Sequence, residues 1–102
     1  MQATLYLPGQ APQLVSTTGL TLPDPNSGYA YPTQAVATLL ECRVEALDVL
    51  ATGLAYVVWT VFDFEEGPAN LAAMAEVGRL TGMAFEPEDE TAELRGPVLV
   101  LH

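Results

Sequence analysis

The stretch from Leu54 to Phe64 constrains the fold more than any other part of the chain. It is rich in β-branched and aromatic residues, and both alternating faces of an extended strand would be apolar there. Because such a strand must be covered on both faces, the pattern predicts an interior strand of a sheet. The side chains concerned are Tyr56, Val58, Phe62 and Phe64 on one face and Val57, Trp59 and Val61 on the other.

The residues from Thr33 to Gly53 show the clearest periodicity. Six polar side chains recur there at spacings of four and three residues, which places them on one stripe of an α-helix. Thr33 can cap the N-terminus of this helix, and Gly53 can follow its last turn. A strand is the alternative for residues 41–46, where polar and apolar side chains alternate until Leu47 and Asp48 break the pattern. The polar stripe consists of Gln34, Thr38, Glu41, Glu45, Asp48 and Thr52.

The other segments predict a second helix and further strands. Turn residues separate them, and proline is tolerated at the first position of a helix. The expected elements are a hairpin with strands at 3–7 and 14–18, a loop from 19 to 32 with a short strand at 20–22, a helix from Gly67-Pro68 to Gly82, and strands at 83–85 and 98–101. The predicted fold is one compact α+β domain over residues 1–102. Its mixed sheet has two covering helices, interior strands at 54–64 and 98–101, and the order ββαβαββ.

The charge balance limits the possible partners. The net charge of −10 arises because the chain has no lysine and three arginines, Arg43, Arg79 and Arg95, against thirteen acids. Nucleic-acid binding requires clustered cations, so we expect neither nucleic acid nor an anionic membrane as a partner. The carboxylates are also too sparse for a mimic of DNA. The absence of lysine suggests a bacterial genome of high GC content.

The sequence carries few motifs that would indicate a cellular compartment or a catalytic activity. Cys42 is the one cysteine, which excludes an intrachain disulfide and fits a reducing compartment. Neither a signal peptide nor an apolar run of membrane-spanning length is recognisable, so we expect a cytoplasmic protein. The one histidine is His102, and no glycine-rich phosphate loop occurs. We therefore expect no catalytic residues and no cofactor.

Three acids mark one candidate site. Asp63, Glu65 and Glu66 cluster where the interior strand meets the second helix, and Mg²⁺ could bind there, joined by acids of the stretch from Glu86 to Glu90. The alternative is that these acids interact with the N-terminal partial charge of the helix or are simply solvated. We favour the alternative and expect no metal dependence.

Arg43 is a second candidate. On the predicted helix it lies opposite the polar stripe, and a buried cation needs a partner. Asp63, backbone carbonyls, an anionic ligand or another subunit could supply it. A core ion pair, a side chain that reaches the surface, or a local failure of the helix would be the structural explanations. The apolar neighbours on this face would be Val36, Leu39, Leu47 and Leu50.

Tyr29 and Tyr31 form the third candidate. Glycine and proline flank these rings, a composition typical of loops that contact partners. Both rings could equally pack on the sheet with their hydroxyls in water, and we favour this packing.

These observations favour a non-catalytic interaction or regulatory module. The helix expected up to Thr52 would be apolar around most of its circumference, so we predict a homodimer with this helix at the interface, and another protein is a further possible partner. The alternatives are a small-ligand or divalent-metal site on Asp63, Glu65 and Glu66, and an acidic inhibitor of a basic protein.

Overall fold

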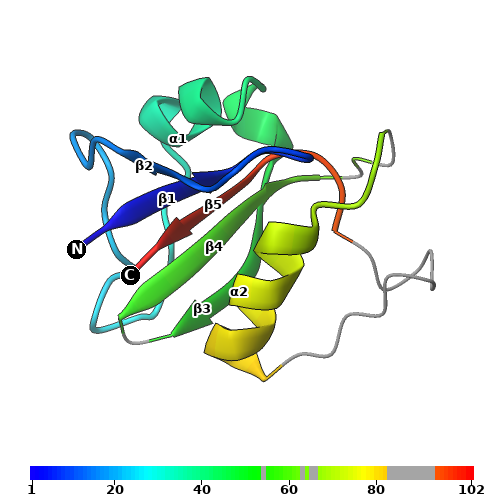
Figure 1. The fold of residues 1–102 in the computed structure, drawn as a ribbon. Helices are drawn as coiled ribbons and strands as arrows, with labels where there is room; N and C mark the ends of the chain where they lie inside the picture. The colour runs from blue at the N-terminus through cyan, green and yellow to red at the C-terminus, as the bar shows by residue number, and fades with distance from the viewer. Residues whose placement is uncertain (54, 63, 65–66, 83–93) are drawn as a thin grey trace.

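Five antiparallel strands form one sheet in the computed structural model, which describes residues 1–53, 55–62, 64, 67–82 and 94–102 (Figure 1). The strand order is β2-β1-β5-β4-β3, and every pairing described is antiparallel. The fold class is therefore α+β as predicted, whereas the expected mixed sheet is wrong for the described strands. The strands are β1 Ala3–Tyr6, β2 Gln13–Val15, β3 Leu47–Gly53, β4 Tyr56–Val61 and β5 Val98–Leu101, and the helices are α1 Gln34–Leu39, α2 Leu71–Thr81 and the 3₁₀ turn η1 Val44–Ala46.

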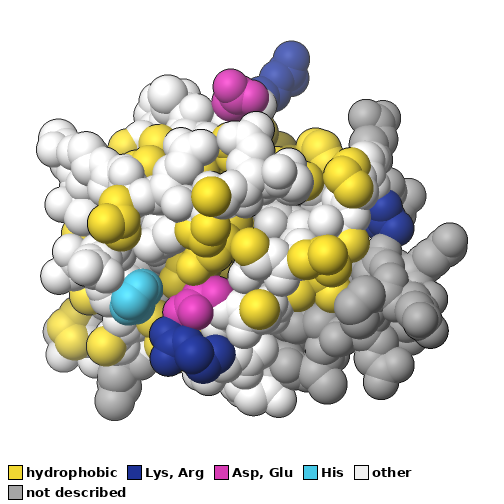
Figure 2. All heavy atoms as spheres, viewed as in Figure 1, with side chains coloured by type: hydrophobic (Ala, Val, Ile, Leu, Met, Phe, Trp, Pro, Cys, Tyr) yellow, Lys and Arg dark blue, Asp and Glu magenta, His cyan; other side chains and the backbone are white. Residues whose placement is uncertain are grey.

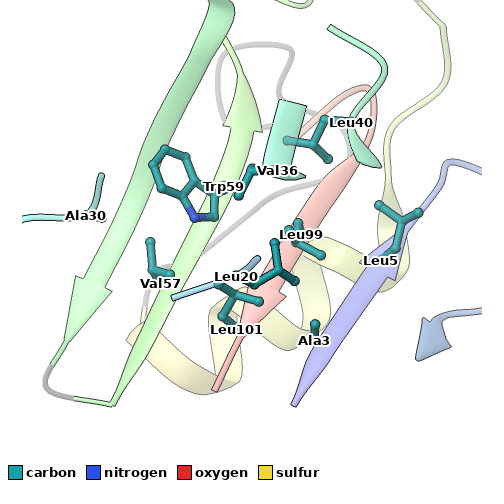
Figure 3. Packing of buried hydrophobic residues seen from close by; sticks show 10 residues of the cluster. All are labelled: Ala3, Leu5, Leu20, Ala30, Val36, Leu40, Val57, Trp59, Leu99 and Leu101. Atoms are coloured by element: carbon teal, nitrogen blue, oxygen red, sulfur yellow. The ribbon is translucent and has the colours of Figure 1, made fainter. Parts of the chain in front are cut away.

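Both faces of the sheet are covered, as the apolar pattern of β4 requires. Trp59 of β4 points into one core cluster, and its neighbour Val58 points into the other. The first cluster joins the sheet to α1 and to the long loop that precedes it (Figure 3), whereas α2 lies across the other face, at the front of Figure 1. The prediction of interior strands at 54–64 and 98–101 is confirmed for β4 and β5.

The predicted helix from Thr33 to Gly53 is wrong beyond its first two turns. Thr33 caps α1 as expected, because its hydroxyl oxygen accepts a hydrogen bond from the Val36 amide at 3.3 Å. The helix ends at Leu39, and Glu41 then takes a positive φ of 53°. Residues 47–53 instead form the edge strand β3.

A β-bulge interrupts the alternation of side chains along β3. The register of β3 against β4 shifts between Val49 and Ala51. A bulge adds a residue to one strand, so side chains before and after it no longer alternate in phase. Val49 packs against the first cluster, whereas Leu50 and Ala51 both pack against the second. Asp48 pairs with Thr60 and Thr52 pairs with Val57, so the bulge places these two polar side chains on opposite faces of the sheet, not on one stripe. Among the described residues, which do not include 83–93, the order of the elements is ββαββαβ and not the predicted ββαβαββ.

The remaining elements agree with the sequence in part. The N-terminal hairpin forms, although β2 ends at Val15, and residues 20–22 are not a strand because Leu20 enters the core from the loop. The helix α2 begins at Leu71, later than expected, and stops as predicted at Gly82, which has a φ of 75°. Among the described helices, none is long and apolar enough to span a bilayer. The strand predicted at 83–85 lies outside the described residues.

Asn70 ties α2 to the sheet. It is 1% exposed, and its Nδ2 donates hydrogen bonds to the carbonyls of Tyr6 at 2.9 Å and Gly96 at 2.8 Å. Its Oδ1 accepts from the Ala73 amide at 3.4 Å, so the same side chain caps the helix. One buried amide thus joins β1, α2 and the residues that enter β5.

Candidate functional site

The segment from Pro23 to Tyr31, called here the tyrosine loop, is held in shape by its own hydrogen bonds. The Asp24 amide donates to the Tyr29 carbonyl at 2.9 Å, and the Gly28 amide donates to the Asp24 carbonyl at 2.7 Å. The carboxylate Oδ1 of Asp24 also accepts from the Asn26 amide at 2.8 Å. Such Asx turns, together with the fixed φ of the two prolines, restrict the backbone before any partner arrives.

Tyr29 and Tyr31 project from this loop into solvent. Ala30 between them is buried in the first core cluster, so the residues on either side are turned outward. Their side chains are 54% and 56% exposed, and the two rings meet edge to face with centroids 4.6 Å apart and an interplanar angle of 77°. The rings therefore pack on each other rather than lying flat in the core. The loop presents them as one aromatic pair.

A cleft of about 320 Å³ opens between the tyrosine loop and the end of β3. Small-molecule sites span roughly 300–1,000 Å³, so this cleft has room for a side chain rather than a large cofactor. The Tyr56 ring lies against Gly53, so a side chain at this position of the wall would displace the ring. The described lining residues are Pro23, Asp24, Pro25 and Gly28 from the loop, and Thr52 and Gly53 from β3.

Asp24 is the one titratable side chain among the described residues that line this cleft. It is half-buried, and it is also the one aspartate, glutamate, lysine or arginine between residues 1 and 40. Its Oδ1 is engaged by Asn26, whereas Oδ2 accepts no hydrogen bond from the described part of the chain. The cleft therefore carries one negative charge with an oxygen available to a ligand.

Trp59 lies in the core cluster that anchors the tyrosine loop. Its side chain is 2% exposed, and its Nε1 has no hydrogen-bond partner within the described residues. Figure 3 shows the nitrogen side of the indole turned toward Val57, whose partner on β3 is Thr52 in the cleft wall. As the one tryptophan of the chain, Trp59 reports on the packing beneath the loop.

The other predicted site residues do not join this site. Arg43 is exposed and precedes η1, which agrees with the expected alternative of a local failure of the helix and not with a cation buried on an apolar helix face. The reason is that α1 ends before Arg43, which leaves the guanidinium in water. Asp63, Glu65 and Glu66 lie outside the described residues, as do the acids from 86 to 90. Within the described ranges, no group of three or more acidic, histidine or cysteine side chains is arranged to hold a metal ion.

The opposite face carries an ion pair that the sequence analysis did not single out. Arg79 Nε donates to Glu76 Oε2 at 3.0 Å, and a second guanidinium nitrogen contacts Oε1. This hydrogen bonding holds the pKa of Glu76 below its usual value, while burial raises the pKa of the nearby Tyr6 hydroxyl. Figure 2 shows this face, with few charged side chains and several separate apolar patches. The spacing of three on a predicted helix was the available signal for the pair.

Asp24 and the cleft also escaped the sequence analysis. The run Asp-Pro-Asn-Ser-Gly at 24–28 signals a turn, but it does not show what the turn faces. The facing wall belongs to β3, which the sequence pattern assigned to a helix. Comparison of the chain with protein-family models, curated proteins and solved structures gave no match.

Proposed function

We propose that this chain is a non-catalytic interaction module that binds a segment of a partner protein on the tyrosine loop and in its cleft. The observation that carries the proposal is the pair of tyrosine rings, each more than half exposed on a loop with internal hydrogen bonds. Tyrosine supplies a large contact area with few rotatable bonds. A loop that is already ordered also loses little entropy on binding.

The chemistry of the cleft supports binding rather than catalysis. General acid–base or nucleophilic catalysis needs a group matched to its task and a second group that orients or activates it. Asp24 is the single titratable side chain in the described lining, and no second titratable group lies there to orient or activate it. One carboxylate beside prolines and glycines suits recognition of a ligand.

Self-association is a separate matter from this proposal. The expected homodimer depends on the apolar circumference of a helix that reaches Thr52. Because α1 ends at Leu39, this apolar helix surface does not form. The dimer stays a prediction for sedimentation equilibrium at several concentrations. Val49→Asp is unsuitable as an interface variant, because Val49 is partly buried against the core and a charge there would destabilise the fold itself.

Site-specific photo-cross-linking tests the proposed function. A benzophenone amino acid replaces Tyr31 in one variant and Leu14 in a control, since Leu14 is also apolar and 73% exposed but lies on β2. We expect one partner protein to be cross-linked from position 31 and not from position 14, and Tyr29→Ser to reduce its yield. Equal yields from the two positions, or no partner from position 31, would show that the loop is not the binding surface.

A further inference from the structure

We propose that the tyrosine loop and its cleft select a cationic side chain, lysine or arginine, from an extended segment of the partner protein. This inference rests on the proposed function and names the chemistry of its ligand. It combines three observations: an incompletely paired carboxylate, an exposed aromatic pair, and a cleft with room for one side chain.

The charge distribution supplies the first step. Asp24 is half-buried in the cleft wall, and no arginine of the described residues forms an ion pair with it. A carboxylate removed from part of its water is stabilised by a cation or by several hydrogen bonds. Asp24 receives one such bond, from the Asn26 amide, and its Oδ2 has no partner in the described ranges. A cation from outside the chain would complete its coordination.

The aromatic pair supplies the second step. A cation within about 6 Å of the centre of a tyrosine ring is attracted by the negative face of the ring. Because Tyr29 and Tyr31 meet edge to face and both are more than half exposed, ring surface remains open to solvent. The Asp24 amide and the Tyr29 carbonyl are 2.9 Å apart, so the carboxylate and the rings belong to one short turn.

The cleft supplies the third step, because it accommodates the aliphatic part of such a side chain. Lysine and arginine bury their methylene groups on apolar surface while the charged head stays near water or an anion. Pro23 and Pro25 provide apolar surface next to Asp24. Oδ1 accepts one bond from Asn26 and keeps a second lone pair, so Asp24 can accept from an ammonium or from a guanidinium, and we expect lysine and arginine to bind with affinities within a few-fold of each other.

The test is a titration of the ¹⁵N-labelled full chain, followed by NMR, with four acetylated and amidated pentapeptides of sequence Gly-Gly-Xaa-Gly-Gly. Xaa is lysine, arginine, norleucine or glutamate, and norleucine is the uncharged match for the lysine stem. We expect saturable shifts centred on residues 23–31 and 52–53 with the lysine and arginine peptides. Norleucine should bind at least about fivefold more weakly, as expected for the loss of a charge-assisted contact.

Variants separate this contact from general attraction to an acidic protein. Asp24→Asn keeps the oxygen that accepts from the Asn26 amide, so the turn should persist. We expect this variant to bind the lysine peptide with about tenfold lower affinity. Tyr31→Leu should lower the affinity for the lysine peptide by roughly two- to fivefold. Asp48→Asn removes the same charge from an exposed position on β3 and should change the affinity by less than about twofold.

Two results would overturn the inference: norleucine binding as tightly as lysine, or equal effects of Asp24→Asn and Asp48→Asn. The cross-linking experiment keeps the two proposals distinct. A partner captured from position 31 without binding of the lysine peptide would leave the interaction module intact and refute the cationic ligand. Binding of the lysine peptide without a captured partner would support the chemistry of the cleft and refute the proposed function.

Discussion

Replacement of Asn70 by alanine should be among the most destabilising single changes in this chain. The change removes two buried donors and leaves the Tyr6 and Gly96 carbonyls without them. An unsatisfied buried polar group costs about 1–3 kcal/mol, and loss of a helix N-cap costs about 1 kcal/mol. Taking the lower part of the first range for each carbonyl, we expect Asn70→Ala to cost about 3–5 kcal/mol. That is a large part of the 5–15 kcal/mol by which a domain is typically stable.

Urea unfolding followed by Trp59 fluorescence measures this loss. With a denaturant slope of about 1–1.5 kcal/mol per molar, the midpoint should fall by more than about 2 M. Asn70→Ser can still cap α2 but cannot reach both carbonyls, so it should recover about 1 kcal/mol relative to alanine. The matched control is Asn26→Ala, an exposed asparagine, which should stay within about 0.5 kcal/mol of the original chain. A cost below about 1 kcal/mol for Asn70→Ala would refute the reasoning.

Three further predictions concern the core, the ion pair and metals. Trp59→Ala should cost about 3–5 kcal/mol in urea unfolding followed by circular dichroism, since the variant has no tryptophan, and emission of the original chain at the wavelength of exposed indole would contradict the packing of Trp59. Arg79→Gln should raise the pKa of Glu76 toward its ordinary value in an NMR titration, and an unchanged pKa would exclude the pair in solution. Because the folded pKa of Glu76 is lowered, the contribution of the pair to stability is present above the ordinary carboxyl pKa and is lost as pH falls through the lowered value. Melting temperatures in EDTA and in millimolar Mg²⁺ should agree, and a rise of several degrees with Mg²⁺ that Asp63→Asn abolishes would show a metal site.

Some of the fold could be predicted because its signals are local. An apolar pattern on both faces identified β4, and the same kind of pattern identified β5. The helix α2 ends at Gly82 as predicted, and this glycine takes the left-handed conformation. The proline- and glycine-rich surroundings of the tyrosine pair indicated a candidate contact loop. The structure adds that the two rings pack edge to face and that Ala30 between them is buried in the core.

Tertiary contacts decided the remainder. Residues 47–53 carry a pattern compatible with a helix, and their pairing with β4, including the bulge after Val49, makes them a strand. Arg43 is exposed because α1 ends at Leu39, before this residue. Asn70 is satisfied by the carbonyl of Tyr6, 64 residues earlier in the chain, and no local pattern reveals that bond.

The sequence by itself therefore determined the fold class, the two interior strands, the acidic balance and the position of the tyrosines. The edge strand and the cleft between Asp24 and Thr52 were decided only in the folded chain. The physical reason is that hydrophobic periodicity and turn propensity act between near neighbours. Backbone pairing, in contrast, joins distant residues, and its hydrogen bonds outweigh the few tenths of a kcal/mol by which local preferences of ordinary residues differ.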